Sequence, residues 1–302
     1  MKPSTLPLGV QLHGALKLHD CNLLGQGVRV AIIDSGIDRD HPGFHGKVKR
    51  QVWYRHGTPL SKDDHGTHVA GTIHFMAPQA DLYDYRVFGA EGELDGDNAI
   101  AASIREAVDV DRCHIINMSL RVSYPIVPAV RKAVEYAHAN GVHMVCAAGN
   151  SGDGDPTTNE LYAFPARWQE TISVAAVKKA GKLPVAYFSE SNPQVDFAAI
   201  GVDVVSLKPG GGFQSMQGTS MASPHVTGFI AALLSNHADR YTPTALKNVL
   251  SSRYAVDIDA KGPDTSTGVG FLTFLSKEEL EQFLINHKQQ RSSSAKIQAY
   301  TY

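Results

Sequence analysis

The sequence has little of what marks several large protein classes. No apolar stretch reaches the ~18 residues that a membrane-spanning helix needs, and 28 lysines and arginines nearly balance 30 aspartates and glutamates. That balance argues against a general binder of nucleic acid or of a charged membrane surface. The aromatic residues, 8% of the chain, show no stacking pattern for nucleic acid. We therefore expect neither nucleic acid nor a membrane among the partners.

Cysteine is scarce, and its pattern excludes two kinds of site. Cys21, Cys113 and Cys146 are an odd number at wide spacings, and no C-x-x-C occurs. No disulfide framework or thiolate metal site is readable from such a pattern. Cys146 lies in an apolar run and is predicted to be a buried structural thiol.

The first residues contain no apolar segment of the kind found in secretory signals. We expect a cytoplasmic protein if Met1 is the native start, and otherwise a secreted one whose leader is not present in this sequence. Neither reading indicates an oligomeric state.

What is present is an alternation of apolar strands and helices. Strands are predicted over residues 28–33, 80–87, 115–120, 142–147 and 172–177, with helices over residues 65–74, 98–110 and 126–140. This pattern predicts an α/β fold of three layers, in which helices cover both faces of a mainly parallel central sheet. A chain of 302 residues buries roughly 75% of its unfolded surface, so its core needs no metal or disulfide.

Three further helices are expected in the last third of the chain. One begins near Ser220, one follows Thr242 and Pro243, and one opens on a capping box at Ser276 and runs to about His287. The polar residues from Gln289 onward are predicted to form a mobile tail. The expected organisation is a domain of residues 1–275 and a C-terminal helix and tail of residues 276–302.

An acid, an imidazole and a hydroxyl occupy the ends of predicted elements. Asp34 ends the first strand, and His65 and Ser220 each open a helix. In parallel sheets such ends gather where sites form, and these groups are the parts of a nucleophilic triad. Singly, each has a structural explanation. Asp34 and Ser220 fit turns or helix caps, and the His65–His68 pair fits a metal site or the core.

Together with their flanks these segments resemble the subtilisin-like serine proteases. The carrying motifs are D-S-G-I-D at residues 34–38, H-G-T-H-V-A-G at 65–71 and G-T-S-M-A-S-P-H at 218–225, within a resemblance running from Leu6 to Phe274. It implies a subtilisin-like fold and a serine endopeptidase that works through an acyl-enzyme. Asp34 would orient the base, His65 would be the general base and Ser220 the nucleophile. Asn150 would donate to the oxyanion, with Thr219 assisting.

The resemblance also implies a cleft for an extended peptide or protein substrate. It places one edge at Ser119, Leu120 and Arg121, the other at Gly92, Glu93 and Leu94, and a further pocket wall at Ala147, Ala148 and Gly149. We expect broad specificity with a large apolar residue before the cut, although the acidic loop after Asn150 would favour basic residues. Arg121 stands where the family has glycine; it either favours acidic residues upstream of the cut or points to solvent.

Among these proteases the sequence is most similar to the intracellular bacterial branch, through the loop of residues 145–161 and the segment of residues 268–272. It departs from the family at the strong calcium site. Ser4 and Gly43 stand at ligand positions, and the ligand loop is missing from residues 71–78. We expect no calcium there and no cofactor for the chemistry. Asp153 and Asp155 are a candidate weak cation site, with a solvated acidic loop as the alternative.

Two other functions use the same residues. A dedicated precursor-maturation protease or a peptide cyclase would share the triad, the cyclase letting an amine attack the acyl-enzyme. A non-catalytic peptide-binding module on the same fold is the second alternative, which a complete triad disfavours.

Overall fold

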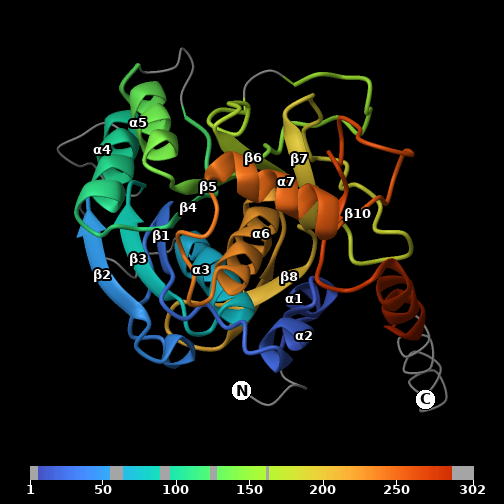
Figure 1. Cartoon of the computed structure of the whole chain (residues 1–302), viewed down its shortest axis with the longest axis horizontal. Coiled ribbons are helices and arrows are strands. Elements are labelled where there is room, and N and C mark those ends of the chain that lie inside the picture. Colours follow the sequence, from blue (N-terminus) through green and yellow to red (C-terminus); the bar gives the residue numbers. More distant parts are fainter. Residues whose placement is uncertain (1–5, 55–63, 89–95, 123–127, 161–162, 288–302) are drawn as a thin grey trace, which may run out of the picture.

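A nine-stranded sheet forms the centre of the molecule (Figure 1). The computed structural model describes residues 6–54, 64–88, 96–122, 128–160 and 163–287. In spatial order the strands are β10 (Ala255–Val256), β11 (Phe271–Leu272), β7 (Val195–Ile200), β6 (Thr171–Val177), β5 (His143–Ala147), β4 (Ile115–Met118), β1 (Arg29–Asp34), β3 (Asp81–Arg86) and β2 (Val48–Trp53). All neighbouring pairs are parallel except β10 with β11. The predicted mainly parallel sheet is confirmed.

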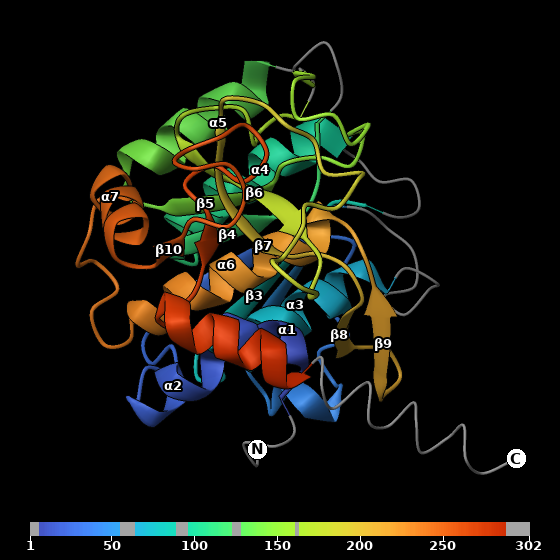
Figure 2. The same cartoon turned by 90° about the vertical axis from the view of Figure 1, so that its right-hand side faces the viewer.

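Helices cover both faces of this sheet (Figure 2). One face packs on α3 (His65–Met76), α6 (Thr219–Leu233) and α7 (Pro243–Arg253), and the other on α4 (Gly96–Asp109) and α5 (Pro128–Ala139). Alternate residues of β1 show the reason, since Val30 and Ile32 join the first core cluster while Ala31 and Ile33 join the second. The predicted α/β three-layer fold is therefore confirmed.

Several elements escaped the sequence analysis. They are α1 (Leu8–Leu12), α2 (Ala15–Asp20), the 3-10 turn η2 (Pro42–Phe44), the strands β2, β7, β10 and β11, and the hairpin of β8 (Val204–Leu207) with β9 (Phe213–Met216). Most are short or lie at an edge. Such strands carry too few buried positions for a clear period-2 pattern.

The C-terminal helix begins where the capping box predicts. Ser276 Oγ accepts from the Glu279 N–H at 3.2 Å, and Glu279 Oε2 accepts from the Ser276 N–H at 2.7 Å. The helix spans residues 277–287, and Leu280 on it is buried in the first core cluster. Lys17 of α2 pairs with Glu279 at 2.8 Å. The helix thus packs against the main core; the predicted tail beyond it lies outside the described residues.

The cysteines agree with the sequence interpretation. Cys146 is fully buried on β5 and burial raises the pKa of its thiol, while Cys21 is exposed. All three thiols are free. Among the described residues, no helix combines the length and the apolar character that crossing a bilayer requires.

Burial lowers the pKa of five buried histidines in the described part of the chain, which makes the fold sensitive to acid. Burial lowers the pKa of His13 to about 3 and that of His68 to about 4. The remaining three, whose pKa burial also lowers, are His74, His143 and His225. Below the unfolded pKa of 6.5 the unfolded chain binds protons that the folded chain cannot accept, so stability is lost as pH falls from 6.5 toward 4.

We expect the free energy of unfolding to fall as the pH is lowered from 6 to 5. Each histidine contributes about 1.4 kcal/mol per unit, and the raised carboxyl pKa values of Asp84, Glu190 and Asp196 act in the opposite direction. Urea unfolding of the Ser220→Ala chain, which avoids self-cleavage, measures this slope. His143→Gln should reduce the slope of the unfolding free energy against pH by about 1.4 kcal/mol per pH unit, the contribution of one histidine. A parent chain whose unfolding free energy does not change between pH 6 and pH 5 would contradict the prediction.

Candidate active site

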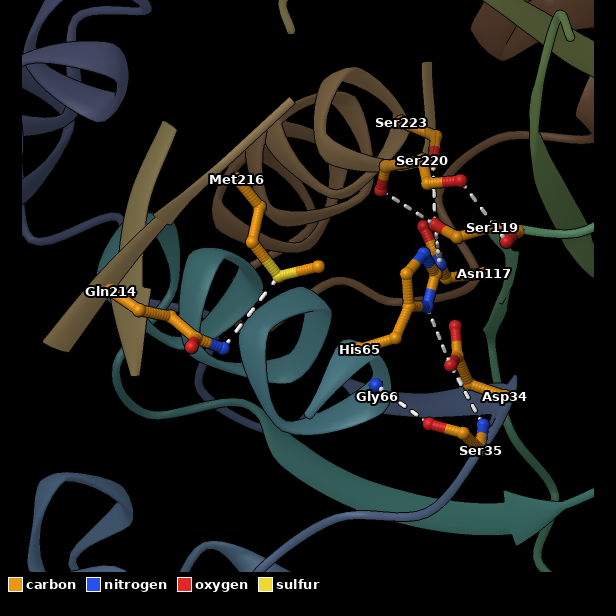
Figure 3. Close-up of polar contacts among 10 residues, drawn as sticks. All are labelled: Asp34, Ser35, His65, Gly66, Asn117, Ser119, Gln214, Met216, Ser220 and Ser223. Atoms are coloured by element: carbon orange, nitrogen blue, oxygen red, sulfur yellow. Dashed lines mark hydrogen bonds and ion pairs between the residues drawn. The ribbon is translucent and has the colours of Figure 1, made fainter. Parts of the chain in front are cut away.

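The acid and the imidazole meet at the carboxyl edge of the sheet (Figure 3). Asp34 is the last residue of β1 and fully buried; His65 is the first residue of α3, with its side chain 26% exposed. His65 Nδ1 lies 2.8 Å from Asp34 Oδ1, which also accepts from the Ser35 N–H at 2.7 Å. An ionised carboxylate only accepts hydrogen bonds, so Nδ1 carries the proton. Nε2 is then the nitrogen that can accept one.

The hydroxyl comes from the other helix on this face. Ser220 is the second residue of α6 and half-buried, and its Oγ donates to the Ser119 carbonyl at 3.3 Å (Figure 3). A hydroxyl has a single proton, so the Ser220 O–H must rotate away from Ser119 before it can donate to His65. Its place in the first turn of α6 leaves the Ser220 N–H without a partner from the helix ladder.

Asn150 is held so that its amide nitrogen faces away from its supports. Its Oδ1 accepts from both the N–H and the Oγ1–H of Thr219, at 2.8 and 2.9 Å. Because these groups are donors, the oxygen of the amide must face Thr219 and Nδ2 must point elsewhere. A Cβ built on Gly218 would lie 3.5 Å from Asn150 Nδ2 and 3.6 Å from the Ser220 nitrogen. The Asn150 amide nitrogen and the Ser220 nitrogen therefore both lie close to Gly218, at the start of α6.

Thr219 is fully buried, and the structure shows how it supports the site. Its hydroxyl donates to Asn150 and accepts from the Gly149 N–H at 3.1 Å. In this arrangement Thr219 fixes the orientation of the Asn150 amide. Its own direct donation to an oxyanion, which the sequence analysis expected, stays a prediction.

A buried polar network beneath Ser220 was not foreseen. Pro224 lies inside α6 and has no N–H for the Ser220 carbonyl four residues earlier. Ser119 Oγ supplies that hydrogen bond at 2.9 Å. The network continues through three buried side chains, with contacts of 2.7 to 3.0 Å: Asn117 and Ser223, which Figure 3 draws, and Thr227. The Ser220–Ser223–Thr227 spacing on one helix face is the signal that could have revealed it.

The predicted substrate walls lie at the ends of two adjacent strands. β4 and β5 pair with Met118 opposite Cys146, so residues 119–121 and 147–149 leave the sheet side by side. Ser119 and Leu120 are buried and Arg121 is exposed. A hollow of about 270 Å³ opens beside the acid–imidazole pair; its lining is Asp34, Ser35, His65, Phe88, Ser119, Leu120 and Arg121. The predicted opposite edge, Gly92, Glu93 and Leu94, lies outside the described residues.

An unpredicted carboxyl group lies behind the second wall. Glu190 is 2% exposed, and a Cβ on Gly149 would lie 2.3 Å from its Oε1. Gly149 also has φ +117°, so both backbone and contact require glycine there. Glu190 Oε1 accepts from the Ser151 N–H at 3.2 Å, and burial raises the pKa of this carboxyl. An acidic group thus lies directly behind the wall formed by residues 147–149.

The candidate cation ligands use their oxygens within their own loop. Asp153 accepts from the Asp155 N–H at 2.8 Å and from Thr158 Oγ1 at 3.0 Å. Asp155 accepts from the Thr157 N–H and hydroxyl. Within the ranges that the structure describes, no three acidic, histidine or cysteine side chains are grouped to hold a metal. Of the two family calcium positions, Ser4 is outside these ranges, and a Cβ on Gly43 would lie 2.9 Å from Leu207.

The fold and the site define an α/β serine hydrolase. At the edge of its parallel sheet are a serine on a helix, a histidine hydrogen-bonded to a buried aspartate, and a fixed amide donor. A sequence profile of the subtilase family of peptidases matches residues 25–270. This chain belongs to the subtilase family and is a serine endopeptidase.

Individual relatives agree with this assignment. The chain is 32% identical over 306 residues to the major intracellular serine protease of Bacillus subtilis (strain 168), covering 93% of this chain and 92% of the relative. It is 36% identical over 249 residues to an intracellular serine protease of Paenibacillus polymyxa, covering 76% and 72% of the two chains. The solved structure of sphericase superposes with a TM-score of 0.76 at 28% identity, covering 91% of this chain and all of that one.

Proposed function

We propose that this enzyme hydrolyses peptide bonds through Asp34, His65 and Ser220. The observation that carries the proposal is the 2.8 Å contact between His65 Nδ1 and the buried carboxylate of Asp34. A carboxylate in that position fixes the imidazole tautomer and stabilises the imidazolium that forms when His65 takes a proton. The residue chemistry and the family membership support the same assignment.

The steps follow from these positions. Ser220 Oγ bonds to the substrate carbonyl carbon while its proton passes to His65 Nε2. The oxyanion accepts hydrogen bonds from Asn150 Nδ2 and the Ser220 N–H. When the tetrahedral intermediate collapses, the C–N bond breaks and His65 gives its proton to the leaving amine. A water molecule then gives a proton to His65 while its oxygen attacks the carbonyl carbon of the acyl-enzyme. The ester C–O bond breaks, His65 returns the proton to Ser220 Oγ, and the new carboxyl terminus leaves.

We propose that the residue before the scissile bond is large and apolar. Its side chain would enter the gap between residues 119–120 and residues 147–149, whose walls are apolar side chains and backbone. The backbone of residues 119–121 would pair with the extended substrate as an added strand. The carboxyl group of Glu190 lies behind Gly149 and, when ionised, adds negative charge to this gap. Lysine and arginine would therefore be the second preference at this position, behind the large apolar residues.

One experiment tests the reaction and its specificity together. The chain is incubated with a peptide library, products are weighed by mass spectrometry, and a parallel sample is treated with phenylmethylsulfonyl fluoride. We expect cleavage after large apolar residues and sulfonylation of Ser220. Cyclic products from leader-bearing peptides would indicate a cyclase instead, and sulfonylation without cleavage of the library a dedicated maturation enzyme. The absence of both sulfonylation and cleavage would contradict the proposal.

We further propose a cytoplasmic location. The relatives named above as intracellular proteases support it, since they share most of their length with this chain. Fractionation of the source cells with an antibody against the chain tests it, and recovery from the medium of intact cells would overturn it.

We also propose that the fold needs no calcium. Asp153 and Asp155 are exposed and satisfied by their own loop, and Gly43 provides no side-chain ligand. Chelation with EDTA should therefore shift the Tm of the Ser220→Ala chain by less than about 2 °C, against the 2–4 °C that 1 kcal/mol of lost stabilisation would give at this size.

The matched control for this prediction is the double variant Asp153→Asn, Asp155→Asn. It should respond to chelator in the same way as the parent. A large fall in Tm that calcium restores in the parent, and that the double variant lacks, would show that the acidic loop holds a cation.

A further inference from the structure

A second buried carboxylate lies on the strand next to Asp34. β1 and β3 run parallel with Ile32 opposite Asp84 and Asp34 opposite Arg86. Side chains alternate along a strand, so Asp34 and Asp84 project from the same face of the sheet, the one that α3 and α6 cover. Both are 0% exposed. A buried ionisable group outside the triad is costly unless something in the fold uses it.

Asp84 holds the segment that follows the catalytic acid. Its Oδ2 accepts from the Ile37 N–H at 3.0 Å and from Gln51 Nε2 at 2.8 Å, and the same Gln51 amide donates to the Ile37 carbonyl at 2.8 Å. Asp84 and Gln51 therefore fix both backbone groups of Ile37. These bonds place the turn that begins directly after Asp34.

The turn after Asp34 is hydrogen-bonded to the first residues of α3. Ser35 Oγ accepts from the Gly66 N–H at 3.0 Å, and Thr67 Oγ1 accepts from the Asp38 N–H at 2.9 Å. The approach is close, since a Cβ on Gly66 would lie 2.4 Å from the Gly36 carbonyl oxygen. His65 is the residue immediately before Gly66. A chain of hydrogen bonds thus runs from Asp84 through residues 35–38 to the start of the helix that bears the base.

Asp84 is also coupled to Asp34 by charge. Asp84 Oδ1 and Asp34 Oδ2 are both buried, and neither has a hydrogen-bond partner within the described part of the chain. The pKa of Asp84 is raised to about 7, chiefly by burial and to a smaller degree by the charge of Asp34, against the lowering effects of the Gln51 and Ile37 hydrogen bonds and the Arg86 charge. The charge of Asp84 therefore changes near neutral pH, in the range in which a histidine base titrates.

We propose that Asp84 is a positioning residue for the His65–Asp34 pair, holding the turn after Asp34 and adding, when ionised, a second negative charge behind the imidazole. The inference rests on the proposed triad. The groups that face Asp84 are Asp34 from β1, Gln51 from β2 and Arg86 from its own strand, and His65 on α3 is reached through Asp34. Of these, only Arg86 is a cation, and it lies on the Asp84 strand itself.

Asp84→Asn tests the inference through a pH profile. Removing the negative charge stabilises the imidazolium less, so the acid limb of kcat/KM should move to lower pH by several tenths of a unit. The alkaline plateau should change little, because the asparagine Oδ1 can still accept from both the Ile37 N–H and Gln51 Nε2, as Asp84 Oδ2 does. The rate of sulfonylation of Ser220 against pH should show the same displacement without any contribution from peptide binding.

Asp81→Asn is the matched control, being the same substitution on the same strand at its other end. Asp81 pairs only with Lys47 and Lys49, at 3.5 and 3.6 Å, near the surface. The acid limb of kcat/KM for Asp81→Asn should coincide with that of the parent. If Asp84→Asn does not fold, Asp84→Ser removes the charge and keeps an oxygen acceptor near Ile37; it should show the same displacement.

The outcomes separate this inference from the proposed function. A folded Asp84→Asn or Asp84→Ser enzyme whose acid limb coincides with that of the parent overturns the role of Asp84 and leaves the triad intact. A displacement to higher pH overturns it as well, because the sign is then wrong. Activity that persists in Ser220→Ala would contradict the proposed function itself.

Discussion

Ser220→Ala should lower kcat/KM roughly 10⁶-fold, the size of loss that removing a triad member causes in subtilisin, a member of the same family. The alanine leaves no nucleophile at the start of α6. Because Ser220 is half-buried and its Oγ makes only the 3.3 Å contact to the Ser119 carbonyl, the fold should be unaffected. Progress curves on a chromogenic peptide, with Tm as the measure of folding, check both parts.

His65→Ala and the double variant make this prediction sharper. The nucleophile and its base act as one unit, so each single loss should be similar and the double variant no worse than either. Independent roles would instead give losses that multiply. The residual rate over water would come from the oxyanion donors and substrate binding. A double variant 10³-fold or more below both singles would contradict the assignment of His65 as the base for Ser220.

Asn150→Ala should lower kcat about 10²- to 10³-fold with little change in KM, a magnitude known for the matching donor of subtilisin. The amide nitrogen faces the place where negative charge develops, so it binds the transition state more strongly than the substrate. Initial rates over a range of peptide concentrations separate the two constants. An equal rise in KM with unchanged kcat would show that Asn150 only binds the substrate.

The alanine variant also removes the acceptor for the buried N–H of Thr219, so stability needs its own control. Asn150→Asp keeps an oxygen that can accept from Thr219 at 2.8 Å while removing the donor. It should remain as stable as the parent and lose at least as much kcat. Thr219→Val removes the hydroxyl contacts to Asn150, at 2.9 Å, and to the Gly149 N–H, at 3.1 Å, and should lower kcat about tenfold by loosening the amide.

The sequence alone predicted the ends of the central elements and the chemistry placed on them. Asp34 follows a run of β-branched and apolar residues that only a buried strand explains, and it is the last residue of β1. His65 and Ser220 lie in the first turns of α3 and α6, as their positions before apolar helical runs predict. These features are local, since the period of apolar residues determines both the element and where it stops.

Neighbouring strand order followed less directly. The pattern predicted a parallel sheet whose strand ends gather where sites form, which favoured Asp34, His65 and Ser220. Residues 119–121 and 147–149 were expected beside them because of the family resemblance. The strands β10 and β11 were missed because they have two residues each, and β2 was missed because it lies at the edge of the sheet and is only partly buried. β7, which is mostly buried, was missed as well. The absence of β2 from the prediction also hid Gln51, which β2 brings to Asp84.

What only the tertiary structure decided is which polar group meets which. Ser119 and Ser220 are 101 residues apart, Gly149 and Glu190 are 41 residues apart, and Asp84 lies 47 residues after Ile37. A polar residue in an apolar run can be predicted from the sequence to be buried. Its hydrogen-bond partner, however, comes from another strand or helix whose placement depends on the packing of the whole core. The sequence therefore determined the fold class and the reacting groups of this protease, while the packing decided the hydrogen bonds that orient them, because those bonds join segments that share no local pattern.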